Sequence, residues 1–335
     1  MKITEQLLTQ WGACSDGKRT FTQKFPEGAE YKEVIAACDE DGHRDYRTWI
    51  FNHAFQHLVA SEIVEAETDL VPKEIEKGLE PLQLLDSTET KNTDTISKEA
   101  SSRLAASGRY SQLAASGRYS QLAASGDDSR LAASGFNSRL AASGRYSQLA
   151  ASGDDSQLAA SGDDSRLAAS GFNSRLAASG RYSQLAASGR YSQLAASGDD
   201  SRLAASGFNS RLAASGFNSR LAASGRYSRL AASGRYSQLA ASGRYSQLAA
   251  SGDDSRLAAS GFNSRLAASG ENSVIASSGL DSTFQIGKGG CAAIAYQDEQ
   301  EKIRFAVAYE GENVKANTWY KVNAKGEFVE VETQS

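Results

Sequence analysis

Serine is the residue of this 335-residue sequence that most often could do chemistry, because it recurs in every nonapeptide of residues 101–279. A serine hydroxyl becomes a nucleophile only beside a general base that takes its proton. The repeated segment contains no histidine, cysteine or lysine, and its first glutamate is Glu271. We therefore expect no enzyme activity and no catalytic residue. A solenoid that cleaves sugars would need a cleft of clustered acidic and basic side chains, and none is visible.

Paired aspartates of the repeat raise the question of calcium. Asp127 and Asp128 are one of five Asp-Asp pairs that follow a glycine. Calcium-binding nonapeptide repeats follow the pattern G-G-x-G-x-D-x-U-x, in which two glycines come together. That glycine pair is missing here, so we interpret the aspartates as solvated or salt-bridged and expect no bound metal.

Cysteine and histidine, the usual zinc ligands, occur together near the N-terminus. Cys14, Cys38, His53 and His57 could supply four ligands, and the two histidines are four residues apart on a predicted helix. However, no two cysteines have the C-x-x-C spacing, and tryptophan and phenylalanine nearby indicate a core. We interpret the cysteines as buried free thiols and expect no cofactor.

A fixed nine-residue period must position the serines and aspartates of the repeat. Leucine recurs every nine residues from Leu104 to Leu266, and Ile275 takes the next place in the unit S-[QR]-L-A-A-S-G-x-x. A continuous helix fails, because nine residues are two and a half turns and each leucine would face opposite to the last. A flexible Ser/Gly linker has no use for a fixed apolar position.

The strand interpretation fits the repeat. In a strand, Ser111, Leu113 and Ala115 face one side, and the residues between them face the other. Gly117 would then turn the corner, where a Cβ is often not tolerated, and the variable pair would lie at the exposed corner. One nonapeptide cannot bury its leucine alone, but stacked copies form a continuous core. The sequence therefore predicts a mainly β fold with a parallel β-solenoid.

Charges at the corners predict that two nonapeptides, or about 18 residues, complete one coil of the solenoid. With two nonapeptides per coil, the pairs that follow every second glycine stack on one edge of the solenoid. From Gly108 to Gly198, these pairs alternate between Arg-Tyr and Asp-Asp. One or three units per coil would stack Asp-Asp on Asp-Asp, and like charges directly opposite each other repel. We expect about ten coils and a rod of roughly 48 Å.

The segments that flank the repeat differ from it in composition. Residues 1–64 predict a small α-containing domain, with helices at 33–37 and 46–64, and residues 65–100 predict a polar linker. The solenoid would span 101–279. Residues 280–335 predict an antiparallel β cap of two hairpins, with strands at 291–296, 303–309, 318–322 and 327–331. Such a cap protects the open end of a stack.

Net charge and cysteine content limit the partners and the compartment. The net charge of −4 is divided into an acidic head (−9), a basic repeat (+8) and an acidic tail (−3). A weak overall charge gives no strong preference for nucleic acid or membranes. Three cysteines favour a reducing compartment, and no signal pattern or transmembrane run is visible, so we expect a cytoplasmic protein.

The tail GENVKANTWYKVNAKGEFVEV, which follows a GGCAAIAY strand, resembles a C-terminal module of uncharacterised phage and prophage proteins with Ser/Ala/Gly-rich short repeats. The head, with Trp11, Cys14, Phe21, Cys38 and Trp49, resembles a small domain that accompanies that module. The resemblance implies a phage-related origin and no known chemistry.

The pair after each glycine varies while the rest of the nonapeptide is nearly constant. This pattern is typical of a rigid protein that binds a partner through its variable residues. We expect a phage-related accessory protein that binds a host protein, with self-association as a related possibility. The alternative is a solenoid that binds a surface or ligand such as ice, glycan or nucleic acid, of which nucleic acid is disfavoured because Asp corners interrupt the positive charge. The candidate binding residues are Arg109, Tyr110, Arg118, Tyr119, Phe136, Asn137, Arg145, Tyr146, Arg181, Tyr182, Arg226 and Tyr227.

Overall fold

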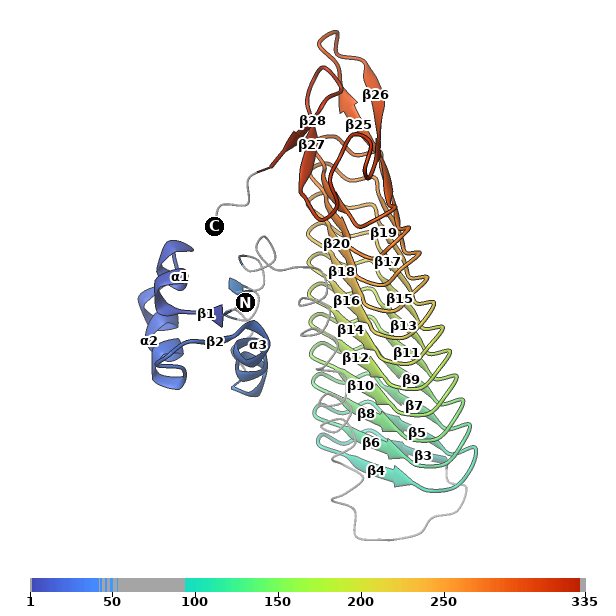
Figure 1. Ribbon diagram of the computed structural model, residues 1–335. Coiled ribbons are helices and arrows are strands. Elements are labelled where there is room, and N and C mark those ends of the chain that lie inside the picture. Colours follow the sequence, from blue (N-terminus) through green and yellow to red (C-terminus); the bar gives the residue numbers. More distant parts are fainter. Residues whose placement is uncertain are drawn as a thin grey trace.

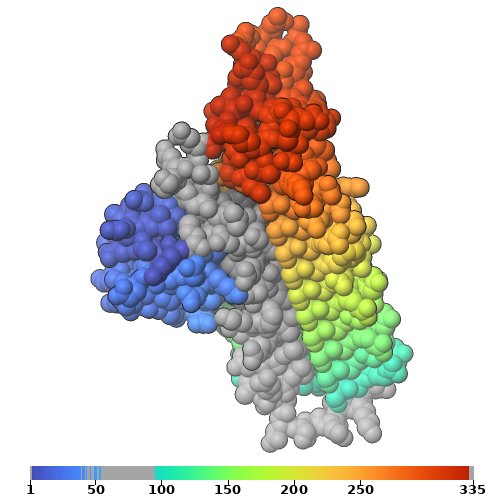
Figure 2. Space-filling view, in the orientation of Figure 1, coloured from blue at the N-terminus to red at the C-terminus, as the bar shows by residue number. Residues whose placement is uncertain are grey.

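In the computed structural model, the chain forms a small N-terminal domain, a long two-sheet solenoid and a C-terminal cap that continues the rod (Figures 1 and 2). The structure describes residues 2–41, 43, 46, 49, 50, 53 and 94–331. No helix within those residues is long and apolar enough to cross a membrane.

The described part of the N-terminal domain includes helices α1 to α3 and a two-stranded sheet. Its elements are β1 (Lys2–Ile3), α1 (Glu5–Gln10), α2 (Ser15–Lys24), β2 (Ala29–Glu30) and α3 (Tyr31–Glu40). The helix α3 confirms the prediction for 33–37. Of the second predicted helix, Tyr46, Trp49, Ile50 and His53 are helical, and the remainder lies outside the described residues. Ile3, Leu8 and Ile35 are buried in the core of this domain.

Two parallel sheets form the solenoid, and successive strands of the chain alternate between them. The even-numbered strands are β4 (Arg103–Ala106), β6 (Gln121–Ala124), β8 (Arg139–Ala142), β10 (Gln157–Ala160), β12 (Arg175–Ala178), β14 (Gln193–Ala196), β16 (Arg211–Ala214), β18 (Arg229–Ala232), β20 (Gln247–Ala250), β22 (Arg265–Ala268) and β24 (Thr283–Ile286). The odd-numbered strands are β3 (Asp94–Ser97), β5 (Gln112–Ala115), β7 (Arg130–Ala133), β9 (Gln148–Ala151), β11 (Arg166–Ala169), β13 (Gln184–Ala187), β15 (Arg202–Ala205), β17 (Arg220–Ala223), β19 (Gln238–Ala241), β21 (Arg256–Ala259), β23 (Val274–Ser277) and β25 (Cys291–Gln297).

Each strand pairs in parallel with the strand two places along the chain, so one coil contains two nonapeptides as predicted. Leu176 lies opposite Leu194 in one sheet, and Leu185 lies opposite Leu203 in the other. The stack has about eleven coils rather than ten, because the parallel ladders reach beyond the nonapeptides at both ends. The strand β3 lies inside the predicted linker, since Thr95 can take the place of leucine opposite Leu113.

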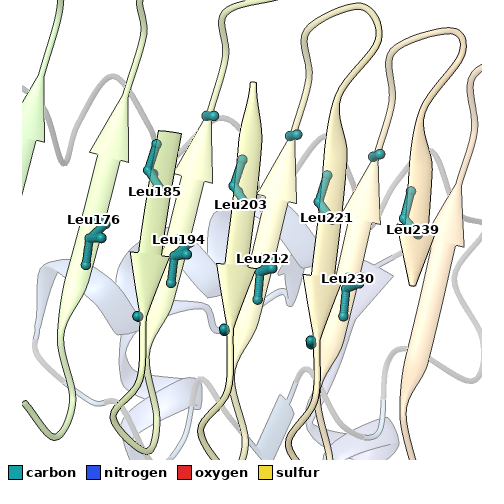
Figure 3. Packing of buried hydrophobic residues seen from close by; sticks show 14 of the residues in the cluster. Leu176, Leu185, Leu194, Leu203, Leu212, Leu221, Leu230 and Leu239 are labelled. Atoms are coloured by element: carbon teal, nitrogen blue, oxygen red, sulfur yellow. The ribbon is translucent and has the colours of Figure 1, made fainter. Parts of the chain in front are cut away.

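The leucines form the core between the two sheets. Leucines of the even strands, such as Leu194, face leucines of the odd strands, such as Leu203, in two columns (Figure 3). Their side chains are 0–2 % exposed from Leu113 to Leu266. Burial of each leucine stabilises the fold by roughly 2 kcal/mol. The inward set of serine, leucine and alanine is the predicted one.

A buried serine hydroxyl secures the corners of the repeat. From β5 to β22, the serine before each strand is buried, and its Oγ donates to the carbonyl oxygen of the glycine three residues earlier, as Ser183 does to Gly180 at 2.7 Å. This hydrogen bond pairs the buried O–H donor of serine with a carbonyl acceptor inside the stack, so that neither group is left unsatisfied. These serines are therefore structural residues.

The repeat glycines are required for a reason other than the turn. None of them has a positive φ, and the left-handed residue of each corner is the second residue of the variable pair, such as Tyr182 with φ 58°. A Cβ built at Gly180 would overlap the carbonyl group of Gly162 in the coil below. The prediction that a Cβ is not tolerated is correct, but close stacking of backbones is the cause.

The C-terminal cap contains the two predicted hairpins. In the first, β25 pairs antiparallel with β26 (Ile303–Tyr309), and in the second, β27 (Tyr320–Val322) pairs with β28 (Phe328–Glu330). The strand β27 also pairs with β24, which closes the even-numbered sheet, and the Phe284 ring lies 6.0 Å from the Tyr320 ring.

A side chain blocks part of the outer edge of β26. Asn313 Oδ1 accepts from the Tyr309 N–H at 2.8 Å, and its Nδ2 donates to the Val307 carbonyl at 3.0 Å. These backbone groups would otherwise be open to another strand. The cap therefore limits recruitment of further strands along the sheet.

Gly180→Ala tests the stacking contact. Alanine ordinarily stabilises a protein relative to glycine by restricting the unfolded chain. Here we expect destabilisation by about 1–3 kcal/mol, because the coils must separate to admit the methyl group. Urea unfolding followed by circular dichroism measures the change, with Ser179→Ala as the exposed neighbouring control. An unchanged midpoint for Gly180→Ala would contradict the close-contact explanation.

Tyr182→Asn tests the left-handed corner. Asparagine tolerates a positive φ better than tyrosine does, and Tyr182 is half exposed, so little packing is lost. We expect a gain of up to about 1 kcal/mol in unfolding free energy, measured by the same titration. The control is Arg190→Asn, at the first variable position of the next corner, where φ is not positive. This substitution should give no gain in unfolding free energy. A less stable Tyr182→Asn protein would show that the tyrosine contributes more by contact than it costs.

Candidate functional site

The variable pairs form two ridges along opposite sides of the solenoid. The charged ridge follows the even strands and consists of Arg109-Tyr110, Asp127-Asp128, Arg145-Tyr146, Asp163-Asp164, Arg181-Tyr182, Asp199-Asp200, Phe217-Asn218, Arg235-Tyr236, Asp253-Asp254 and Glu271-Asn272. The aromatic ridge follows the odd strands and consists of Arg118-Tyr119, Phe136-Asn137, Asp154-Asp155, Phe172-Asn173, Arg190-Tyr191, Phe208-Asn209, Arg226-Tyr227, Arg244-Tyr245 and Phe262-Asn263.

The predicted binding residues are divided between these ridges and do not form one surface. The charged ridge contains Arg109, Tyr110, Arg145, Tyr146, Arg181 and Tyr182. The aromatic ridge contains Arg118, Tyr119, Phe136, Asn137, Arg226 and Tyr227. A partner that contacts one ridge would therefore meet only half of the predicted set.

Ion pairs join successive coils of the charged ridge. The Asp127 carboxylate lies 3.6 Å from the Arg109 guanidinium of the coil before and 3.5 Å from the Arg145 guanidinium of the coil after. Arg181 lies 3.2 Å from Asp163. Four arginines, eight aspartates and one glutamate give this ridge a net charge of −5. Its arginines are thus engaged within the stack.

The first aspartate of each pair also accepts a backbone hydrogen bond from the next coil. Asp163 Oδ1 accepts from the Arg181 N–H at 2.8 Å, and Asp154 and Asp199 accept in the same way from a phenylalanine N–H. The backbone hydrogen bond and then the guanidinium of Arg181 hold the pKa of Asp163 below its usual value. These oxygens therefore have a structural role, which weakens the case for calcium ligation.

Aromatic rings follow one another through consecutive coils of the aromatic ridge. The ring centroids of Phe172, Tyr191, Phe208, Tyr227 and Tyr245 are separated by 5.2, 6.2, 5.4 and 5.0 Å in that order. Most of these contacts are edge-to-face, the favoured geometry for aromatic pairs. The rings are nevertheless 37–45 % exposed, so the ladder presents a continuous aromatic surface.

Arginines beside these rings are available for contact. Arg118, Arg190, Arg226 and Arg244 form no ion pair with any residue that the structure describes. With two aspartates they give the aromatic ridge a net charge of +2. Tyrosine, phenylalanine and arginine are enriched at protein interfaces, where aromatic and arginine side chains supply much of the binding energy.

Sequence reasoning missed most of this ladder. Phe172, Tyr191, Phe208, Tyr245 and Phe262 were not among the predicted binding residues. The signal was present: once two nonapeptides per coil are assumed, the pairs after Gly171 and every second glycine up to Gly261 are Phe-Asn or Arg-Tyr without interruption.

The candidate zinc ligands do not meet in the described part of the N-terminal domain. Cys14 is exposed and its Sγ accepts from the Gly17 N–H at the start of α2, whereas Cys38 is buried. His53 Nδ1 lies 2.8 Å from the Trp49 carbonyl oxygen. His57 lies outside the described residues. Within the described ranges, no three histidine, cysteine or acidic side chains are grouped as metal ligands would be.

Comparison with known proteins identifies the N-terminal part of the chain. Residues 1–59 match the family model described as the YdhT N-terminal domain. This is a YdhT-like domain. An uncharacterized protein of Escherichia coli K12, YdhT, is 52 % identical over 46 residues, which are 13 % of this chain and 17 % of YdhT. The chain therefore matches about a sixth of that relative, and the family match ends at residue 59, before the solenoid. No solved structure matches the chain.

The carboxylates of the charged ridge predict loss of stability in acid. Asp127 and Asp163 have folded-state pKa values below the ordinary 3.8, so their stabilisation is complete above pH 3.8 and is lost as the pH falls through the folded-state values. Asp163→Asn keeps an acceptor for the Arg181 N–H but removes the charge. We expect it to be less stable than the wild type at pH 7 and equal to it near pH 2, measured by urea titration. A difference independent of pH would contradict the electrostatic cause.

Proposed function

We propose that this chain is a non-enzymatic interaction protein, a phage-related accessory protein that binds a host protein in the cytoplasm along the aromatic ridge of its rigid solenoid. The observation that carries the proposal is the uninterrupted aromatic run from Phe172 to Phe262, with Arg190, Arg226 and Arg244 beside it. The composition matches that of interface hot spots.

Rigidity of the frame supports this assignment. Each corner is fixed by a backbone hydrogen bond between coils, such as the Tyr191 N–H to the Phe208 carbonyl at 2.9 Å, and by a buried serine. Because the backbone of each corner is already fixed, little conformational freedom of the backbone is lost on binding, which favours affinity. The phage-related origin is supported by the resemblance of the repeat and tail, and the cytoplasmic location by the low count of three cysteines.

The charged ridge provides a matched control for the experiment. Tyr191, Tyr227 and Tyr245 lie on the aromatic ridge, and Tyr110, Tyr146 and Tyr182 occupy the same corner position on the charged ridge. All six have φ near 60° and are at least 40 % exposed. Replacing either set by serine therefore changes the same chemistry and conformation on opposite sides of the rod.

The full chain and the two triple variants are used as bait in host lysate treated with nuclease, and bound proteins are quantified by mass spectrometry. We expect one host protein to be bound at least tenfold less by Tyr191→Ser/Tyr227→Ser/Tyr245→Ser and normally by Tyr110→Ser/Tyr146→Ser/Tyr182→Ser. Equal binding to both variants would contradict the assignment to this ridge. Binding that disappears with nuclease and moderate salt would favour the alternative of a nucleic-acid-binding solenoid.

A further inference from the structure

The outer face of the odd-numbered sheet is open to solvent. Its outward residues recur at every second nonapeptide and form three rows: glutamine or arginine from Gln112 to Arg256, alanine from Ala132 to Ala276, and serine from Ser116 to Ser278. All of them are exposed. The corresponding alanines of the even-numbered sheet are different, since Ala141 is 0 % exposed. We call the three rows, with the outward residues of β3 and β26, the open face.

Larger apolar side chains lie at both ends of the alanine row. Ile96 of β3 lies opposite Ala114 and is 78 % exposed. At the other end, Val307 of β26 lies opposite Ala293 and is 44 % exposed, with Phe305 and Tyr309 on either side of it. A groove of about 1470 Å³ runs between them along the alanines and serines. Contiguous apolar surface on this scale marks an interaction site.

We propose that the open face binds the open face of a second copy of this chain, with the two rods parallel. Thirteen strands spaced by ~4.8 Å make the face about 60 Å long, and four residues across make it about 13 Å wide. The resulting ~800 Å² per copy is the area that a standard stable interface needs. The open face and the aromatic ridge share the phenylalanines at their common margin, and the tests below measure pairing of the chain separately from host binding.

The distribution of arginine and phenylalanine fixes the orientation. Where a strand of the open face begins with arginine, the corner at its far end is phenylalanine in four of five coils, as in Arg130 with Phe136 and Arg202 with Phe208. The exception is Arg220, whose coil ends in Arg226. Arginine and phenylalanine thus occupy opposite margins of the face in the same coil.

In the parallel arrangement, a two-fold axis runs parallel to the rods. Each coil then faces the same coil of the partner, and the arginine margin of one copy lies against the phenylalanine margin of the other. Each arginine then meets the partner's serine row and the phenylalanine behind it, where guanidinium and ring attract. Antiparallel rods would instead place the arginine margins against each other. The parallel arrangement is therefore favoured by charge.

The mass of the purified chain in solution tests the pairing. Light scattering should give twice the 35.5 kDa of one chain at micromolar concentration. Ala168→Glu/Ala204→Glu/Ala240→Glu places three carboxylates on the open face and should give a monomer that remains folded. Ser125→Glu/Ser143→Glu/Ser179→Glu adds the same charges at exposed positions of the other sheet and should remain a dimer. A monomeric wild type, or a dimer that survives the alanine substitutions, would overturn the proposal.

Cross-linking tests the orientation. Ala132→Cys is made with Cys14→Ser and Cys291→Ser, and buried Cys38 is kept. In parallel rods the two introduced cysteines lie within reach of a dimaleimide of about 10 Å, and we expect a covalent dimer that the background without Ala132→Cys does not form. In antiparallel rods, Ala132 of one copy lies near Ala276 of the other. The two introduced cysteines at position 132 would then be about 38 Å apart along the stack. Cross-linking only in a mixture of Ala132→Cys and Ala276→Cys chains would refute the parallel arrangement.

Discussion

Backbone contact between coils is the constraint on which the solenoid depends. From Gly126 to Gly279, the glycine of each corner lies so close to the carbonyl group of the glycine one coil earlier that no side chain fits between them. The serine that follows donates its hydroxyl to the glycine carbonyl of its own corner, and the next strand then begins. These two contacts repeat with the coil, so glycine, serine and leucine recur at fixed places while other positions are free to vary.

Freedom to vary is concentrated at the first two residues after each glycine. The second of these must adopt a positive φ, which asparagine and aspartate tolerate and tyrosine adopts at a cost. The eight tyrosines there, such as Tyr191 and Tyr227, are therefore not explained by the backbone. The rings of Tyr119, Tyr191, Tyr227 and Tyr245 contact neighbouring rings in the aromatic ridge, and all eight tyrosines are at least 40 % exposed. A conformational cost accepted for an exposed ring is consistent with a role in binding.

Much of the architecture could be predicted because it follows from the period. The nine-residue spacing of leucine excludes a helix, and the alternation of Arg-Tyr with Asp-Asp after Gly108 and Gly126 gives the number of units per coil. The cap hairpins were predictable from their alternating strands. The start of the ladder was not, because β3 contains Thr95 instead of leucine and resembles the polar segment before it.

Differences between the two sheets could not be predicted from any local pattern. Ala141 and Ala150 occur in the same sequence, L-A-A-S-G, yet the first is fully buried and the second is exposed. Exposure is decided by what the whole chain places against each sheet, and a repeat of nine residues contains no information about that. The surface chemistry nevertheless follows from the repeat, since the strand that begins with Arg166 is followed by Phe172 at its corner and the one that begins with Gln184 is followed by Arg190. Because adding or removing two nonapeptides adds or removes one complete coil, the length of such a surface can change without any change in its chemistry.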